Sequence, residues 1–181
     1  RESMKEKKGK LAIKDITLIG MMVAVIEVCK VALAWAPNIE LTSFLLIMFT
    51  LFFGGKIVFV VPVFILIEGA MYGPQLWWIM YLYAWPLLVF ITWMFRKQES
   101  IWFWCVLSSL FGFAFGFLCS FPYVVIGAAG GGILNGLYAG FTWWVAGIPF
   151  DMIHGVANFV IMMILYHPVR MILKEAQKIY D

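Results

Sequence analysis

The residues of this chain that are best suited to chemistry are a few acidic, amide and imidazole side chains inside long apolar runs. Asp151 and His154 are three positions apart, and Asn158 follows four positions after His154. In a helix this spacing puts all three side chains on one face. Ionisable side chains within membrane segments are costly and mark functional sites by default. This face therefore predicts a polar binding site, with a buried structural network bridged by His154 as the alternative.

The residue types favour binding over catalysis. Asp151 and His154 form an acid/base pair by type, but the serines and cysteines available as nucleophiles lie in no recognisable motif. The step from His154 to Asn158 is too short to define a metal site, and the three cysteines lack metal-ligand spacing. We expect no catalytic residue, no metal and no cofactor, and a membrane-embedded enzyme is a weak alternative.

Other polar residues, and many aromatic ones, lie near the ends of the apolar runs. Trp and Tyr commonly form a belt at membrane interfaces, which explains most of the aromatic residues but not the acidic ones on the same side. Aromatic walls with a few polar groups are typical of a ligand pocket. The candidate ligand-binding residues are Asn38, Glu40, Glu68, Tyr72, Gln75, Trp78, Trp143, Trp144, Asp151, His154 and Asn158.

Glu27 and Lys30 lie within the first apolar run and are three positions apart. That spacing allows the two side chains to pair on one helix face. We therefore expect a Glu27–Lys30 ion pair within the membrane. The alternative is that Lys30 reaches an anionic group of a substrate.

The composition predicts an integral membrane protein. Of its 181 residues, 64% are hydrophobic and only 13% are charged, and the mean hydropathy is +0.95. A soluble domain is about half apolar and about a quarter charged. We expect one membrane domain over residues 1–181, no cleavable signal segment and no nucleic-acid partner. The predicted fold class is all-α with six transmembrane helices, at about residues 16–36, 41–53, 57–71, 76–95, 101–120 and 149–173.

The basic residues predict the orientation in the membrane. They concentrate in residues 1–14, at Lys56, in the Arg96–Lys97 loop and near the end of the last run, and Lys30 is the exception. Short loops rich in Lys and Arg stay in the cytoplasm. Both termini are therefore expected to be cytoplasmic, and the ligand pocket to face outward.

The Gly-rich segment 121–147 is expected on the outer side. It extends the fifth helix, enters the membrane as a re-entrant segment, or forms a cap with a short helix near residues 135–145. No inverted repeat is evident, which disfavours the two-halved architecture of secondary transporters. An ion-coupled secondary transporter is therefore only the alternative function. The chain has no Walker A phosphate loop, so we expect it to depend on partners for ATP hydrolysis.

Three segments carry a resemblance to a known family. They are residues 37–41, residues 147–159 and the small residues Gly20 and Ala24, four positions apart in the first run. Over essentially its whole length, the chain resembles the substrate-binding S component of energy-coupling factor (ECF) transporters. The resemblance implies high-affinity binding of a vitamin or related micronutrient at a prokaryotic cell membrane. It also implies docking through Gly20 and Ala24 on a transmembrane coupling subunit, which works with two cytoplasmic ATPases.

The residue types of the predicted pocket bear on its ligand. Carboxylates accept hydrogen bonds and attract cations, and aromatic faces suit planar rings and cations. A heteroaromatic amine or a nucleobase-like compound fits better than a polyanion. Pyridoxine-type vitamers, a deazaguanine such as queuine, hydroxymethylpyrimidine and cobalamin all stay open. An acid such as pantothenate also stays open, because Lys30 carries a positive charge.

Overall fold

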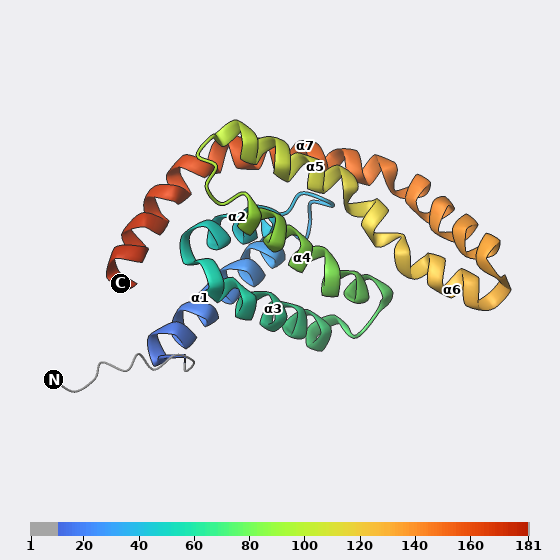
Figure 1. The fold of residues 1–181 in the computed structure, drawn as a ribbon, viewed down its shortest axis with the longest axis horizontal. Coiled ribbons are helices and arrows are strands. Elements are labelled where there is room, and N and C mark those ends of the chain that lie inside the picture. The colour runs from blue at the N-terminus through green and yellow to red at the C-terminus, as the bar shows by residue number, and fades with distance from the viewer. Residues whose placement is uncertain (1–10, 181) are drawn as a thin grey trace.

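The computed structural model describes residues 11–180, and these form helices joined by short connections (Figure 1). The cytoplasmic position predicted for the basic residues of segment 1–10 falls outside the described part of the chain. No strand occurs between residues 11 and 180. The elements are α1 (Ile13–Ala32), α2 (Thr42–Phe53), the short 3₁₀ helix η1 (Gly54–Lys56), α3 (Ile57–Tyr72), α4 (Leu76–Met94), α5 (Ile101–Cys119), α6 (Phe121–Gly131) and α7 (Ile133–Tyr180).

The predicted all-helical class is confirmed, and several helices are suited to a membrane. Within the described residues, four helical stretches are long and apolar enough to cross one. They are Thr42–Tyr72, Leu76–Met94, Ile101–Gly131 and Ile133–Tyr180. The first of these is divided by η1, where Gly54 adopts a φ of 53° that an L-residue rarely takes. The helices α2 and α3 on either side of η1 agree closely with the predicted second and third runs.

The last helix begins much earlier than the sequence indicated. The sixth run was expected to begin at about Pro149, and proline is common in the first turn of a helix. Instead α7 begins at Ile133 and carries Pro149 inside it. The reason lies in segment 121–147, where α6 and the first part of α7 form a hairpin that turns at Gly132, with a φ of 84°. Small residues on both arms let the two backbones approach closely. The expected extension of the fifth helix is found for residues 121–131, whereas residues 133–147 belong to α7.

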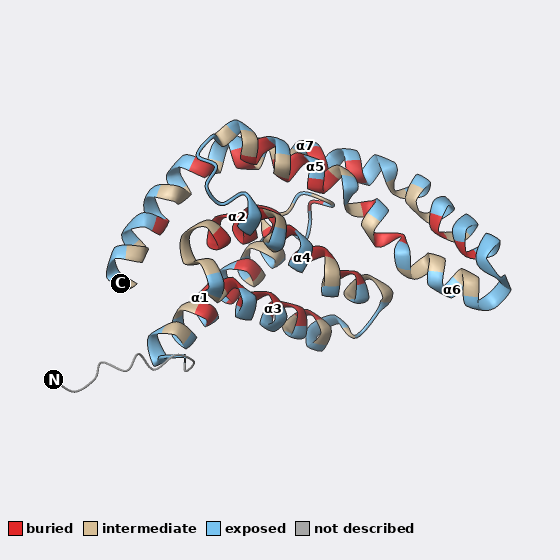
Figure 2. Cartoon of the chain, in the orientation of Figure 1, coloured by how far each residue is buried: buried red, intermediate tan, exposed pale blue. Residues whose placement is uncertain are grey.

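The two arms of this hairpin extend past the other helices (Figure 1). The helix α7 has 48 residues, and at 1.5 Å per residue it is about 72 Å long. A bilayer's hydrocarbon core is only about 30 Å thick. Figure 2 shows that α6 and the facing part of α7 are largely exposed or half-buried.

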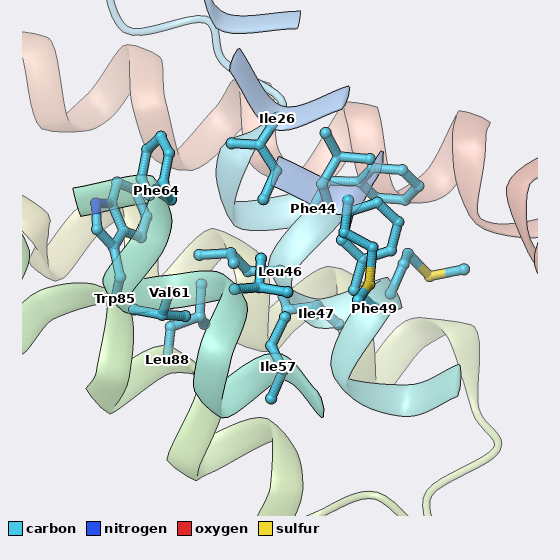
Figure 3. Packing of buried hydrophobic residues seen from close by; sticks show 14 of the residues in the cluster. Ile26, Phe44, Leu46, Ile47, Phe49, Ile57, Val61, Phe64, Trp85 and Leu88 are labelled. Carbon is cyan, nitrogen blue, oxygen red and sulfur yellow. The ribbon is translucent and has the colours of Figure 1, made fainter. Parts of the chain in front are cut away.

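The core lies mainly between α1, α2, α3 and α4 (Figure 3). Ile26, Leu46, Ile47, Phe64 and Leu88 are fully buried there. Side chains of α2 point toward both α4 and α7, which explains why nearly all of this short helix is buried. Trp104 and Met162 extend the core to α5 and α7.

The beginning of α1, η1 and the end of α7 meet at one end of the molecule. Lys14 Nζ donates to the carbonyl oxygen of Tyr180 at 2.8 Å. Lys56 Nζ lies 3.3 Å from Asp15 Oδ1 and 3.6 Å from the centre of the Tyr180 ring. Three segments that the charge pattern assigned to the same side are thus in direct contact.

Candidate functional site

A cavity of about 850 Å³ lies between the α1–α2 loop, α4, α5, α6 and α7. Its walls are largely aromatic, and Tyr123 of α6 stacks on Trp143 of α7 with ring centres 4.6 Å apart. This volume lies within the range of about 300–1,000 Å³ that is usual for small-molecule sites.

Four of the predicted ligand-binding residues line this one cavity. Asn38 comes from the loop before α2, Gln75 precedes α4, and Trp143 and Asp151 belong to α7. Asn38 has a φ of 59°, a left-handed conformation that asparagine tolerates better than most residues. The structure therefore brings together polar side chains that lie more than a hundred residues apart in sequence.

Asp151 has one occupied and one free carboxylate oxygen. Its Oδ1 accepts a hydrogen bond from the backbone N–H of Gly116 at 2.9 Å. Its Oδ2 is buried and has no hydrogen-bond partner among the described residues. A buried acceptor without a partner costs free energy comparable to a lost hydrogen bond. Asp151, which lines the cavity, therefore keeps one acceptor oxygen that no group in the described residues uses.

Glu40 and His154 form a second polar contact beside the cavity. Glu40 Oε1 lies 3.1 Å from His154 Nε2. The same carboxylate accepts hydrogen bonds from the backbone N–H of Thr42 at 2.9 Å and the hydroxyl of Ser43 at 2.6 Å. Burial by itself raises the pKa of Glu40, but His154, Ser43 and Thr42 together hold it lower, at about 2. The carboxylate also satisfies free N–H groups at the beginning of α2.

His154 is connected to the cavity wall through an aromatic ring. Phe115, which lines the cavity, lies edge-on to the imidazole with ring centres 5.1 Å apart. Asn158 is one turn further along α7 and donates to the carbonyl oxygen of Ser108 at 3.2 Å. Its Oδ1 has no partner in the described part of the chain. Asp151, His154 and Asn158 thus share the helix face that the sequence predicted, and this face packs on α5.

The close contact between α5 and α7 depends on glycine. A Cβ atom at Gly112 would lie 2.8 Å from the Gly155 backbone. No real Cβ atom approaches backbone so closely without a shift of the helices. This contact brings Asp151 within reach of Gly116 and fixes one wall of the cavity.

Seven of the eleven predicted ligand-binding residues are not among the residues that line this cavity: Glu40, Glu68, Tyr72, Trp78, Trp144, His154 and Asn158. Trp78 donates its indole N–H to the carbonyl oxygen of Ile65 at 2.7 Å and lines a separate apolar cavity of about 650 Å³ between α3 and α4. Trp144 packs edge-on against Phe117 at 5.5 Å. Tyr72 packs edge-on against Trp77.

A second charged cluster lies on the other side of Trp77 and Tyr81. Lys30 Nζ donates to Glu68 Oε2 and lies 3.3 Å from the Tyr81 hydroxyl. The predicted Glu27–Lys30 ion pair is wrong, because α3 packs on α1 and offers Lys30 the buried carboxylate of Glu68. Neither oxygen of Glu27 has a hydrogen-bond partner in the described residues.

Sequence reasoning omitted several residues of the cavity wall. Trp77 and Tyr81 are i and i+4 on α4 and line the cavity together. Each ring of the Trp77–Tyr81–Trp85 series lies 5.3 Å from the next, so the i, i+4 spacing was an available signal. Phe115, Cys119 and Phe150 also line the cavity, but nothing in their residue types distinguishes them from the membrane-facing apolar residues.

Gly20 and Ala24 both lie on an exposed face of α1. A Cβ atom at Gly20 would meet no other atom within 4 Å. This face is therefore open to another helix.

Among the described residues, no group of His, Cys, Asp and Glu is arranged to hold a metal ion.

No protein-family model matches the chain, and neither a curated protein nor a solved structure shows significant similarity to it. The class that the fold and the site define is an all-helical protein with several membrane-compatible helices and one cavity with aromatic walls and polar groups.

Proposed function

We propose that this chain is a membrane-embedded binding protein for a small micronutrient, acting as the S component of an ECF-type importer. The observation that carries the proposal is the cavity lined by Asp151, Asn38, Gln75 and Trp143. It has the volume, the aromatic walls and the few polar groups of a small-molecule site.

The proposed topology has six spans, with both termini in the cytoplasm of a prokaryotic cell and the cavity open to the outside. It is supported by the contacts that join Lys14, Lys56 and Tyr180 at one end. Basic segments favour the cytoplasmic side. Asn38 and Gln75, on the connections α1–α2 and α3–α4, belong to the opposite side in this arrangement.

The proposed ligand is a heteroaromatic amine or a nucleobase-like compound. Asp151 Oδ2 is a buried acceptor without a partner in the described residues, so a ligand with hydrogen-bond donors or a positive charge suits it best. Tyr123 and Trp143 offer faces for a planar ring. We assign Glu40 and His154 the role of holding the α1–α2 loop against α7, because the Glu40 carboxylate already has several partners.

The proposed partners are a transmembrane coupling subunit and two cytoplasmic ATPases. Gly20 and Ala24 give α1 an exposed face of small residues. In lipid, such faces let two helices approach closely. We assign this face to docking of the coupling subunit.

An ion-coupled carrier is the second candidate function. The observation in its favour is the partly buried cluster of Glu27, Lys30 and Glu68, since charged groups within a membrane often form ion or proton pathways. This candidate predicts that the protein accumulates its substrate without ATPases.

Native mass spectrometry of the detergent-purified protein tests the binding proposal. The wild-type protein is expected to release one small molecule of defined mass, and Asp151→Asn to retain far less of it. Removal of a charged hydrogen bond costs about 1.5–3 kcal/mol, or roughly 10- to 150-fold in affinity. Glu175→Gln is the matched control, because this exposed α7 carboxylate contacts Lys178 far from the cavity. Equal retention by wild type and Asp151→Asn would count against the cavity as the binding site.

A further inference from the structure

The ammonium group of Lys30 is enclosed by aromatic rings. Its Nζ lies 5.0 Å from the centre of the Tyr81 ring, 5.5 Å from Trp77, and 5.7 Å from both Phe64 and Tyr72. Cations within about 6 Å of a ring centre are attracted by its face, and cages of such rings recognise ammonium ligands. We call these four rings, together with the Glu68 carboxylate that Lys30 contacts, the ammonium cage.

The charges of the cluster do not balance. Glu27 and Glu68 supply two carboxylates, and Lys30 supplies one ammonium group. Glu68 is fully buried, yet its Oε1 has no partner within the described residues, and the same holds for both oxygens of Glu27. An unpaired charge costs much free energy when it is buried in a protein or lies within a membrane segment. Two carboxylates therefore share one ammonium group among the described side chains of this cluster.

The cage and the cavity share a wall. Trp77 and Tyr81 line the 850 Å³ cavity and also belong to the cage. Lys30 reaches the cage from α1 on a flexible four-carbon chain, and its side chain is 27% exposed. Lys30 and Glu68 therefore lie next to two rings that also line the cavity.

Glu27 offers Lys30 a second position. It precedes Lys30 by three residues on α1, a spacing at which two side chains can pair. If Lys30 turned from Glu68 to Glu27, both carboxylates would have a cationic partner once a ligand cation occupied the cage. The unpartnered oxygens of Glu27 fit this role.

From these contacts we propose that the ammonium cage is a subsite for a positively charged nitrogen of the ligand, and that Lys30 fills it until the ligand displaces Lys30 onto Glu27. This inference rests on the proposed function, because it assigns one part of the ligand to one part of the cavity. It narrows the substrate class to organic cations. A purely anionic ligand would not compete with Lys30 for the four rings and the Glu68 carboxylate.

Two probes of nearly equal shape test the subsite. Choline carries a quaternary ammonium group, and 3,3-dimethylbutan-1-ol replaces the charged nitrogen by carbon. Binding of both to the detergent-purified protein is measured by calorimetry, with tryptophan fluorescence as a second readout. Lys30→Met removes the internal competitor, so choline is expected to bind about tenfold tighter than to wild type, while the neutral alcohol gains nothing. Lys30→Met/Glu68→Gln should lose that gain.

Lys56→Met is the matched control, because Lys56 also lies over an aromatic ring but at the other end of α1. It should bind choline as wild type does. Glu27→Gln keeps Lys30 but removes its second partner, so choline should bind several-fold more weakly than to wild type. Should Lys30→Met fail to fold, Glu27→Gln/Lys30→Met retains the wild-type net charge of the cluster and takes its place.

Two results would overturn the inference. One is a folded Lys30→Met or Glu27→Gln/Lys30→Met protein that binds choline no more tightly than wild type. The other is an equal gain for the neutral alcohol. If the protein retains a ligand that Asp151→Asn loses while either result is obtained, the proposed function stands and only the ammonium subsite falls. If either result is obtained and Asp151→Asn also retains the ligand as wild type does, the binding proposal falls as well.

Discussion

His154 Nε2 lies 3.1 Å from Glu40 Oε1, and this contact joins α7 to the loop before α2 across 114 residues of sequence. The Glu40 carboxylate also accepts hydrogen bonds from Thr42 and Ser43. One side chain therefore stabilises the beginning of a helix and holds that helix against another. Asn38, which lines the cavity, lies two residues before Glu40.

The first prediction concerns acid stability. The folded-state pKa of Glu40 is lowered from 4.5 to about 2. A carboxylate with a lowered pKa stabilises the folded protein above its unfolded-state pKa and loses that contribution as pH falls toward the folded-state value. Between about pH 5 and pH 2, wild type should lose up to about 3 kcal/mol more stability than Glu40→Gln. Thermal unfolding in detergent across this range measures it. Parallel pH profiles of the two proteins would contradict the assigned role.

The second prediction concerns the packing of α5 on α7. Gly112→Ala places a methyl group 2.8 Å from the Gly155 backbone, and such overpacking costs about 1–3 kcal/mol. Thermal unfolding should show this loss, and the shift should weaken ligand retention because Asp151 moves away from Gly116 and the wall that they form changes shape. Gly130→Ala is the control, since nothing lies within 4 Å of its added Cβ. Equal stability of the two variants would exclude a tight α5–α7 contact.

The third prediction concerns orientation in the membrane. Cysteines introduced at Ile39 and Gln98, in a chain without the native cysteines, should react with an impermeant maleimide from opposite sides of the membrane. Ile39 is chosen over Asn38 because a cysteine would be strained at the φ of 59° found at Asn38. Both positions are exposed. Labelling of both from the same side would refute the six-span topology.

The fourth prediction separates binding from docking. Replacement of Gly20 and Ala24 by leucine fills the exposed face of α1 without contact to the cavity. Ligand binding should be unchanged, while co-purification with the coupling subunit and uptake by the complete transporter should fall sharply. Leucine at Val25, which is exposed on a different face of the same helix, is the matched control. Undiminished uptake by the double variant would assign docking to another surface.

Much of the fold follows from the long apolar runs and from the turn residues between them. The apolar runs and the breaks at Gly54–Gly55 and Gly73 predicted α2, α3 and α4 closely. The start of α7 was missed because Pro149 is a strong local signal for a helix start, whereas the α6–α7 packing that keeps it inside a helix is a tertiary effect. Local spacing cannot reveal which helices pack together.

The same distinction explains the site. The i, i+3, i+4 spacing correctly put Asp151, His154 and Asn158 on one face. It failed for Glu27 and Lys30, since the spacing permits a pair but does not include the competing Glu68 from α3. The aromatic wall residue Phe115 carries no polar signal, so only the fold identifies it.

The central claim is that the chain binds its ligand but does not drive transport. Its most direct test is uptake by liposomes that contain the purified protein alone, supplied with the small molecule that native mass spectrometry identifies and with proton and sodium gradients. We predict ligand bound in proportion to protein and no accumulation against a gradient. Concentrative uptake without partner ATPases would contradict the account and favour an ion-coupled carrier that uses Glu27, Lys30 and Glu68.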